Sequence, residues 1–161
     1  RRRSAEKSPR ALAFTAPPQQ CVAPRGTLHD EPPSPVKPGI TEEISADRAS
    51  SVTTFRLANA GLAGHAYLLL GTLSGTSPGF ALGTLHVPLN QDGLTNALIG
   101  AIPSPALLGF LGTLDATGAA TATLTAPALP GMLGLDLHFA YVQDGSAWNF
   151  ASNPVALRVV R

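Results

Sequence analysis

Short apolar runs recur along the chain from residue 51 onward, and glycine, proline, asparagine or aspartate residues separate them. The turn residues return about every 8 to 12 positions, a spacing that is typical of sandwiches and barrels made of short strands. We therefore predict an all-β fold, an antiparallel β-sandwich of about seven to nine short strands, over residues 51–161. The runs predicted as strands are 52–58, 65–73, 84–89, 94–99, 109–114, 120–126, 134–142, 147–152 and 155–160.

Two hairpin turns are marked by their residue types. Asp115 and Gly118 bracket two residues in "GTLDATGAATATL", the pattern of a type I turn followed by a left-handed glycine. Asp144-Gly145 lies between two aromatic-rich runs, and this dipeptide is a strong hairpin signal. Alternation along 134–142 also predicts one face that points into the core, made of Leu135, Leu137, Phe139 and Tyr141.

The stretch "YLLLGTLSGTSPG" (67–79) predicts a central strand, buried on both faces, followed by a loop. Gly71 within it indicates either a bulge or a close approach of another group to the backbone. Pro78 and Gly79 are expected to set the turn that carries the chain to its next strand. Segments 104–112 and 126–134 are likewise expected to be loops with at most one turn of helix.

The first fifty residues differ in composition from the rest of the chain. They hold eight of the fifteen prolines and eight of the eleven Lys and Arg residues. Such a segment cannot bury enough apolar surface to offset its ordering entropy, so we predict a disordered, Pro-rich tail or linker over residues 1–50. Cys21 is the single cysteine, which excludes an intramolecular disulfide and a cysteine-based metal site.

Residues 51–161 are unusually neutral, with three Arg, four Asp, no Lys and no Glu. Ordinary soluble domains carry about 25% charged residues. A nucleic-acid partner is not expected, because that binding depends on several Lys or Arg contacts to phosphates. No apolar stretch reaches about 18 residues, so no transmembrane segment is predicted. Because no initiator Met is present, we expect the chain to be a piece of a longer protein.

Residues that could support catalysis or metal binding are few and scattered. His65, His86 and His138 form no HxH or HxxxH pair, whereas a metal site needs two or three converging ligands. "NQDG" (90–93) has part of a calcium loop but lacks its first aspartate and its distal glutamate. A hydrolase would need at least two of the four residues Asp136, His138, His86 and His65 to lie within about 4 Å of each other. We predict no enzymatic activity, no cofactor and no metal.

Aromatic residues flank the Asp144-Gly145 turn and offer two interpretations. Tyr141 and Trp148 would stabilise the hairpin as cross-strand partners by up to about 1 kcal/mol each. The alternative is that both residues contact a ligand, with Trp148 stacking on a sugar ring. Trp148 and Tyr141 are therefore the candidate ligand-contact residues, and surface glycans or other protein subunits are the candidate partners.

Four segments carry a resemblance to a known kind of module. They are "YLLLGTLSGTSPGFALGTLHVPLN", "GTLDATGAATATLTAP", "LGLDLHFAYV" and "FASNPVAL", in this order. Over about residues 52–160 the chain resembles an uncharacterised C-terminal β-sandwich module of large secreted or surface proteins of environmental bacteria. The resemblance implies an extracellular or cell-surface location, and it implies no catalytic residue.

These observations favour a non-catalytic extracellular or cell-surface module of a larger secreted protein, acting in attachment, display or passive structure. Two alternatives remain open at this point. One is a carbohydrate-binding module that uses Trp148 and Tyr141. The other is a self-assembling filament or coat subunit, since neutral β-domains with exposed sheet edges are prone to edge pairing.

Overall fold

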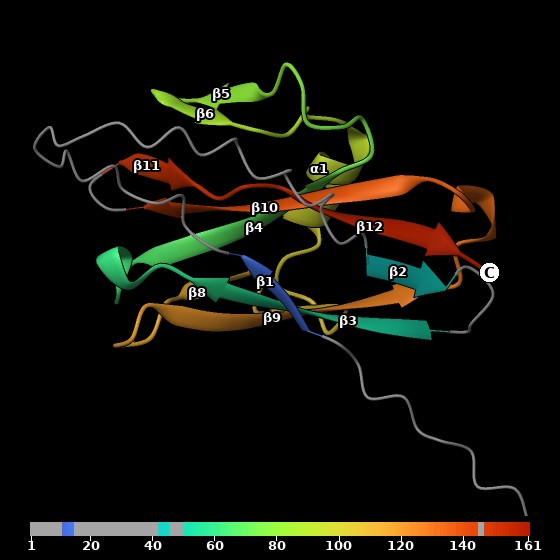
Figure 1. Cartoon of the computed structure of the whole chain (residues 1–161), viewed down its shortest axis with the longest axis horizontal. Coiled ribbons are helices and arrows are strands. Elements are labelled where there is room, and N and C mark those ends of the chain that lie inside the picture. The colour runs from blue at the N-terminus through green and yellow to red at the C-terminus, as the bar shows by residue number, and fades with distance from the viewer. Residues whose placement is uncertain (1–10, 15–41, 46–49, 145–146) are drawn as a thin grey trace, which may run out of the picture.

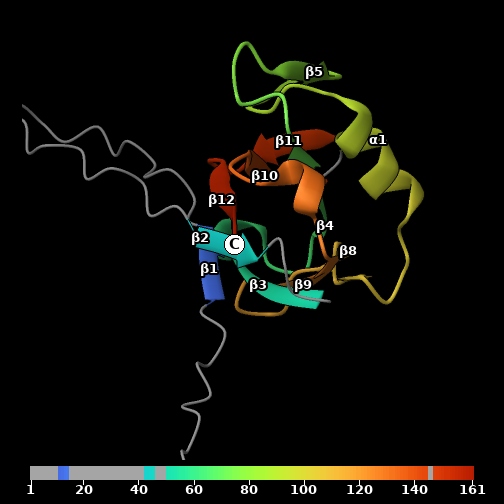
Figure 2. The same cartoon turned by 90° about the vertical axis from the view of Figure 1, so that its right-hand side faces the viewer.

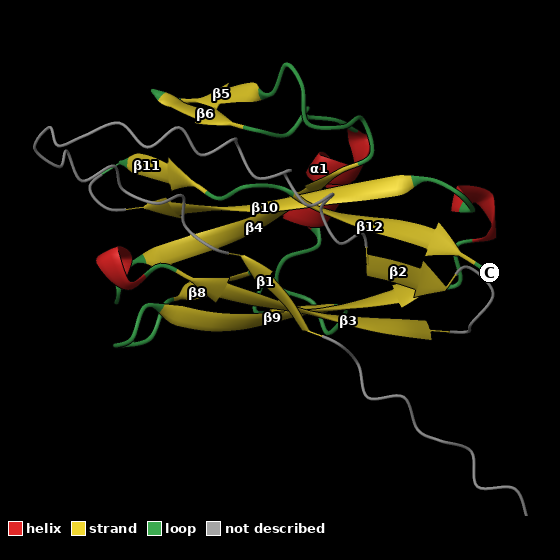
Figure 3. Ribbon diagram, in the orientation of Figure 1, coloured by secondary structure: helices red, strands yellow, loops and turns green. Residues whose placement is uncertain are grey.

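The structure is a computed structural model, and it describes residues 11–14, 42–45, 50–144 and 147–161. These residues form twelve strands, one α-helix and two short 3-10 turns (Figures 1 and 3). The elements are, in chain order, β1 (Ala11–Phe14), β2 (Glu42–Ser45), β3 (Ser50–Ala58), η1 (Ala60–Leu62), β4 (Ala66–Thr72), β5 (Phe80–Leu82), β6 (Leu85–Val87), α1 (Gly93–Gly100), β7 (Leu107–Leu108), β8 (Leu111–Thr113), β9 (Ala119–Pro127), η2 (Pro130–Met132), β10 (Asp136–Asp144), β11 (Trp148–Ala151) and β12 (Val155–Val160).

Two sheets face each other across a common core. Sheet A has the strand order β1-β3-β9-β7. Sheet B has the order β2-β12-β10-β4-β8. Strand β11 is an additional member of this sheet and pairs with β10. In the view along the strands, α1 lies at one side of the sandwich and β1, β2 and β12 lie at the other (Figure 2). The predicted all-β sandwich is therefore confirmed, with mostly antiparallel pairing.

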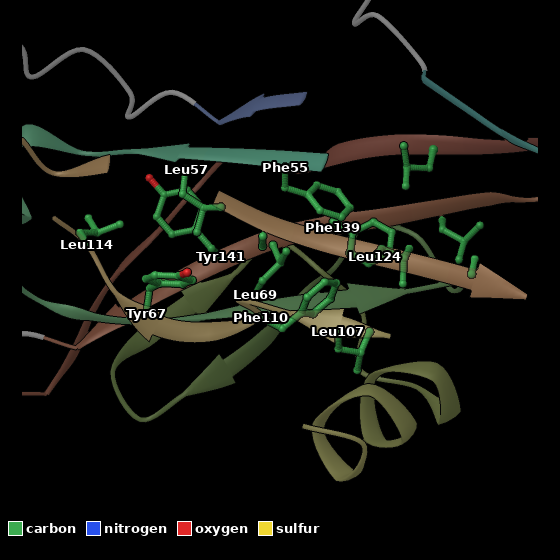
Figure 4. Packing of buried hydrophobic residues seen from close by; sticks show 14 of the residues in the cluster. Phe55, Leu57, Tyr67, Leu69, Leu107, Phe110, Leu114, Leu124, Phe139 and Tyr141 are labelled. Carbon is green, nitrogen blue, oxygen red and sulfur yellow. The ribbon is translucent and has the colours of Figure 1, made fainter. Parts of the chain in front are cut away.

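The main core lies between the two sheets and is centred on three phenylalanines. The ring of Phe55 lies 4.9 Å from that of Phe139 and 6.0 Å from that of Phe110, centroid to centroid (Figure 4). Leu137 and Tyr141 also point into this core, as the alternation predicted. Leu135 does not, because it precedes β10 and remains 47% exposed.

A second, smaller core lies on the outer face of sheet B. The β5–β6 hairpin lies over this face (Figure 1), and its side chains pack there. Strand β4 is therefore buried on both faces, which confirms the prediction for the stretch after Tyr67. The buried members of this second core are Leu70, Val87, Leu89, Ala140 and Val142.

Gly71 marks a close approach rather than a bulge. Strands β4 and β10 pair without interruption from Ala66 opposite Asp144 to Thr72 opposite His138. A Cβ atom on Gly71 would lie 2.6 Å from Phe139 Cε1 and 2.7 Å from Leu98 Cδ1. The missing side chain thus lets the core and helix α1 pack against the strand backbone.

The predicted strand over 94–99 is wrong, because these residues belong to helix α1. Asp92 caps the helix by accepting a hydrogen bond from the Thr95 amide, and the Thr95 hydroxyl bonds back to the Asp92 amide. This reciprocal arrangement is a capping box with threonine in the place that glutamate usually takes. Leu94 and Leu98 pack against the main core. A six-residue apolar run alone does not distinguish a buried strand from such a helix.

The turn at Asp115–Gly118 forms as predicted, but the hairpin does not. The Gly118 amide donates to the Asp115 carbonyl, and Gly118 has a φ of 78°. Strand β8 nevertheless pairs with β4 in sheet B, whereas β9 pairs with β3 in sheet A. The turn therefore carries the chain from one sheet to the other. The second predicted hairpin, β10–β11, does pair, with its residues 145–146 outside the described part of the chain.

Replacing Gly118 by alanine is expected to lower the free energy of unfolding by about 2 kcal/mol. Alanine is strained in the left-handed backbone conformation of this position, and its side chain would overlap with neighbouring atoms. A Cβ atom there would meet the Asn59 carbonyl oxygen. Thermal or urea unfolding measures the loss. Gly131→Ala is the matched control, because nothing lies within 4 Å of its Cβ position. Equal losses of stability in both variants would contradict the left-handed backbone and the close contact described for Gly118.

The chain passes from sheet A to sheet B twice through corners of the same construction. One corner joins β3 to β4 through η1, and the other joins β9 to β10 through η2. In each corner a glycine of positive φ follows the 3-10 turn by two residues, Gly64 at 76° and Gly134 at 82°. The two corners therefore join equivalent pairs of strands, since β3 pairs with β9 and β4 pairs with β10, both antiparallel.

Two stretches of the predicted disordered tail are strands. Residues Ala11–Phe14 form β1, which runs parallel to β3, and Glu42–Ser45 form β2, which runs parallel to β12. The expectation of a tail without regular structure is therefore wrong for these stretches. Residues 1–10, 15–41 and 46–49, including Cys21, lie outside the described residues.

Candidate functional site

Tyr141, one of the two predicted ligand-contact residues, is fully buried at 0% exposure. Its hydroxyl donates a hydrogen bond of 3.0 Å to the Ala58 carbonyl, and its ring lies 5.7 Å from that of Phe150. Burial raises the pKa of the Tyr141 hydroxyl to about 12, and the bond to Ala58 offsets this only in part. In this position the Tyr141 side chain packs in the core and presents no face to a ligand at the surface.

Trp148, the other predicted contact, lies on the opposite face of sheet B. It sits across from Asp144 in the β10–β11 pairing and packs, half-buried, against the second core. Strand β11 also contacts β6 of the overlying hairpin. Since Tyr141 points into the main core, the structure does not bring the two aromatic rings to one surface. Packing, the first of the two interpretations of these residues, is what the structure shows.

The histidines named in the hydrolase hypothesis lie apart. His65 Nδ1 is 3.1 Å from the Asp144 carbonyl oxygen, just before β4, whereas His138 lies opposite Thr72 at the far end of that strand. His86 lies against Gly79 in the β5–β6 hairpin. Within the described part of the chain, no group of three or more His, Cys, Asp or Glu residues could hold a metal ion.

Asp136 and Asp115 both accept hydrogen bonds from neighbouring residues of the fold. Asp136 accepts two hydrogen bonds from Arg158, of 2.9 and 3.0 Å, and these bonds hold the pKa of its carboxyl below the usual value. Asp115 accepts from the Thr117 hydroxyl at 2.6 Å and from the amides of Thr117 and Ala119, which also lowers its pKa. Both carboxylates therefore stabilise local structure.

The densest polar cluster in the described structure surrounds Asp92, and we call it the Asp92 hub. One carboxylate oxygen accepts hydrogen bonds of 2.8 and 2.9 Å from the amides of Leu73 and Ser74. The same oxygen accepts from the hydroxyls of Thr72 and Ser74, both at 2.9 Å. The second oxygen caps α1 through Thr95. The hub thereby fastens the end of β4, the following loop and the start of α1 to one another.

Among the described residues, hydrogen-bond donors and no cation stabilise the charge of Asp92. Burial alone would raise the pKa of its carboxyl, but hydrogen bonds from Thr95, Leu73, Thr72 and Ser74 outweigh this and lower the pKa far below its usual value. A carboxylate with several such donors stays ionised over the ordinary pH range. "NQDG" (90–93) was weighed only as an incomplete calcium loop, so this role of Asp92 was not predicted. The Asp-x-x-Thr spacing was the available signal.

Asn90 fixes the loop that follows β4, residues 74–79. Its side-chain oxygen accepts from the Gly79 amide at 2.9 Å, and its amide group donates to the carbonyls of Ser74 and Ser77 at 2.7 and 2.8 Å. The backbone groups of Ser74, Gly75, Ser77 and Gly79 and the hydroxyl of Ser74 are thus hydrogen-bonded inside the protein. The loop turns the chain, as predicted.

The sheet edges are the remaining places where this sandwich offers backbone groups to a partner. On one side, β1 lies along β3 and β2 lies along β12. On the other side, the edges are the two-residue β7 and the three-residue β8. Leu108 and Leu111, 59% and 58% exposed, lie on these short edges. Short strands limit edge-to-edge pairing, whereas on the opposite side the segments β1 and β2 of this chain extend the sheets beside β3 and β12.

The described residues contain no helix long and apolar enough to cross a membrane. Comparison with protein families, with curated proteins and with solved structures gave no match. The fold and its side-chain contacts are therefore the basis for a functional conclusion.

Proposed function

We propose that residues 51–161 are a non-catalytic β-sandwich module of a larger secreted or cell-surface protein, with a structural or display role. The observation that carries this proposal is the engagement of the polar side chains. Asp92, Asp115 and Asp136 each accept hydrogen bonds that hold the fold together. Groups tied in this way stabilise loops and strands, which is what a passive module requires.

The neutral surface supports the same proposal. The outward-facing residues of sheet A include Thr54, Thr123 and Thr125, with Arg56 as a cation among them. A surface of this kind offers neither a charged patch for steering a ligand nor a deep cluster of titratable groups. The resemblance of the chain to modules of secreted and surface proteins supports the location.

Cell fractionation tests the location directly. In the source cells, protein carrying this module is expected in the medium or on the surface, where protease added to intact cells removes it. Protein that is fully protected until the cells are lysed would contradict the proposal.

A glycan array tests the alternative function, carbohydrate binding through Trp148 and Tyr141. The full chain is expected to give no signal above background, because Tyr141 is buried and Trp148 is packed under the β5–β6 hairpin. Trp148→Ala is the matched variant. Binding by the wild type that the variant loses would replace the proposed function with carbohydrate binding.

A further inference from the structure

Strand β1 occupies a sheet edge that is longer than β1 itself. Strand β3 pairs along its whole length, Ser50–Ala58, with β9 on one side. On its other side, β1 pairs with it over four residues, from Ala11 opposite Thr54 to Phe14 opposite Leu57. The edge of β3 is therefore a parallel acceptor for an extended segment. Main-chain hydrogen bonds provide the affinity in this mode of recognition.

The covalent connections of β1 and β2 differ greatly in length. Residues 46–49 join β2 to β3, and four residues span at most about 14 Å. This short link keeps β2 on its own sandwich. Residues 15–41 separate β1 from β2, and 27 residues can span up to about 90 Å. Chain length alone therefore does not require β1 to pair with the β3 of its own molecule.

Pairing within one chain and pairing between two chains use the same register. The balance between them then depends on concentration, because a tether gives its segment an effective concentration of the order of millimolar. At micromolar concentration the segment fills its own edge. Where copies are crowded to millimolar local concentration, the segment of a second copy competes on equal terms.

We infer that the edge of β3 in sheet A is a strand-acceptor site, and that Ala11–Phe14 of a second copy of this chain is its occupant in an assembly. The inference depends on the register of β1 and on the length of residues 15–41, and it does not depend on the proposed location or on the absence of catalysis. This contact would join the copies if the chain is the self-assembling subunit that the sequence left open as an alternative.

Single-cysteine chains test the exchange. In a Cys21→Ser background, one full-length chain carries Ala11→Cys and a second, isotope-labelled chain carries Thr54→Cys. Neighbouring strands lie about 4.8 Å apart, within the Cα separation that a disulfide spans. Mass spectrometry measures the mixed disulfide, which can form only between molecules. We expect its yield to rise with concentration between about 10 μM and 1 mM.

The control replaces Thr54→Cys with Thr121→Cys, on the strand beyond β3 and opposite Arg56. Thr121 is the more exposed of the two positions, so random collision would favour the control. The in-register pair is expected to give at least about tenfold more mixed disulfide, since the control cysteine lies beyond disulfide reach of β1. Equal yields would overturn the inference.

A chain carrying both Ala11→Cys and Thr54→Cys separates the two modes of pairing. It is expected to close within one molecule at micromolar concentration and to form linked dimers near 1 mM, as the tether argument requires. Closure within one molecule at every concentration, with no mixed disulfide in the first experiment, would overturn exchange between copies. No disulfide in either experiment would overturn the acceptor site itself.

Discussion

Replacing Phe139 with alanine is expected to lower the free energy of unfolding by about 3 to 5 kcal/mol. Phe139 is 1% exposed, and its ring lies 4.9 Å from that of Phe55 and 6.4 Å from that of Phe110. It also covers the bare backbone at Gly71. Because domains of this size are stable by only about 5 to 15 kcal/mol, the variant is expected to unfold at a much lower urea concentration, followed by Trp148 fluorescence.

Leu135→Ala is the matched control, because Leu135 has the same alternation in the sequence but is 47% exposed. Its expected loss is about 0.5 kcal/mol or less. A loss as large as that of Phe139→Ala would show that Leu135 belongs to the core and would contradict the placement of β10.

Replacing Asp92 with asparagine is expected to cost about 3 kcal/mol, because charge-assisted hydrogen bonds are lost while the shape is kept. Asparagine offers one acceptor oxygen, so it can serve either the Thr95 cap or the amides of Leu73 and Ser74. The donors on the other side then face the NH2 group of the asparagine, which cannot accept their hydrogen bonds. Urea unfolding at neutral pH measures the loss.

The same substitution is expected to change the pH dependence of stability. The folded pKa of Asp92 is lowered, whereas an unfolded aspartate has a pKa of about 3.9. The stabilisation is therefore complete above the unfolded pKa and is lost as the pH falls below about 4. The difference in unfolding free energy between the wild type and Asp92→Asn should shrink over that window.

Asp115→Asn is the control for the pH experiment. Asp115 is fully exposed in its turn, and the hydroxyl of Thr117 contributes most to its lowered pKa. Solvent screens such an exposed interaction, so its removal should flatten the acid side of the stability profile less than Asp92→Asn does. A larger effect from Asp115 would contradict the central place of the Asp92 hub.

Much of the fold was predictable because its strands are short and strongly marked. The alternation over β10 and the buried run of β4 identified core residues such as Phe139 and Leu69. The helix over Gly93–Gly100 was missed, because its apolar run is as short as a strand. The pairing after Asp115 was missed for another reason. A turn specifies its own dihedral angles but not the sheet to which each flanking strand belongs.

The functional residues were harder to predict than the strands. Trp148 was chosen because aromatic residues are common in ligand sites, yet its environment depends on the β5–β6 hairpin, some 60 residues away in the chain. Asp92 gathers donors from Thr72 to Thr95, and that convergence exists only after β4 and α1 have packed. The matching corners at Gly64 and Gly134 were overlooked because the similarity between their sequences is short.

The parallel pairing of β2 with β12 also has a mechanical consequence. In this pair Glu42 lies beside Leu157 and Ser45 lies beside Val160. Tension between the chain before Glu42 and the chain after Val160 would pull the two strands in opposite directions along their length. All the hydrogen bonds of the pair would then be loaded in shear at once, rather than opened one after another. If the module lies within a longer chain, the β2–β12 pair would therefore resist stretching of that chain.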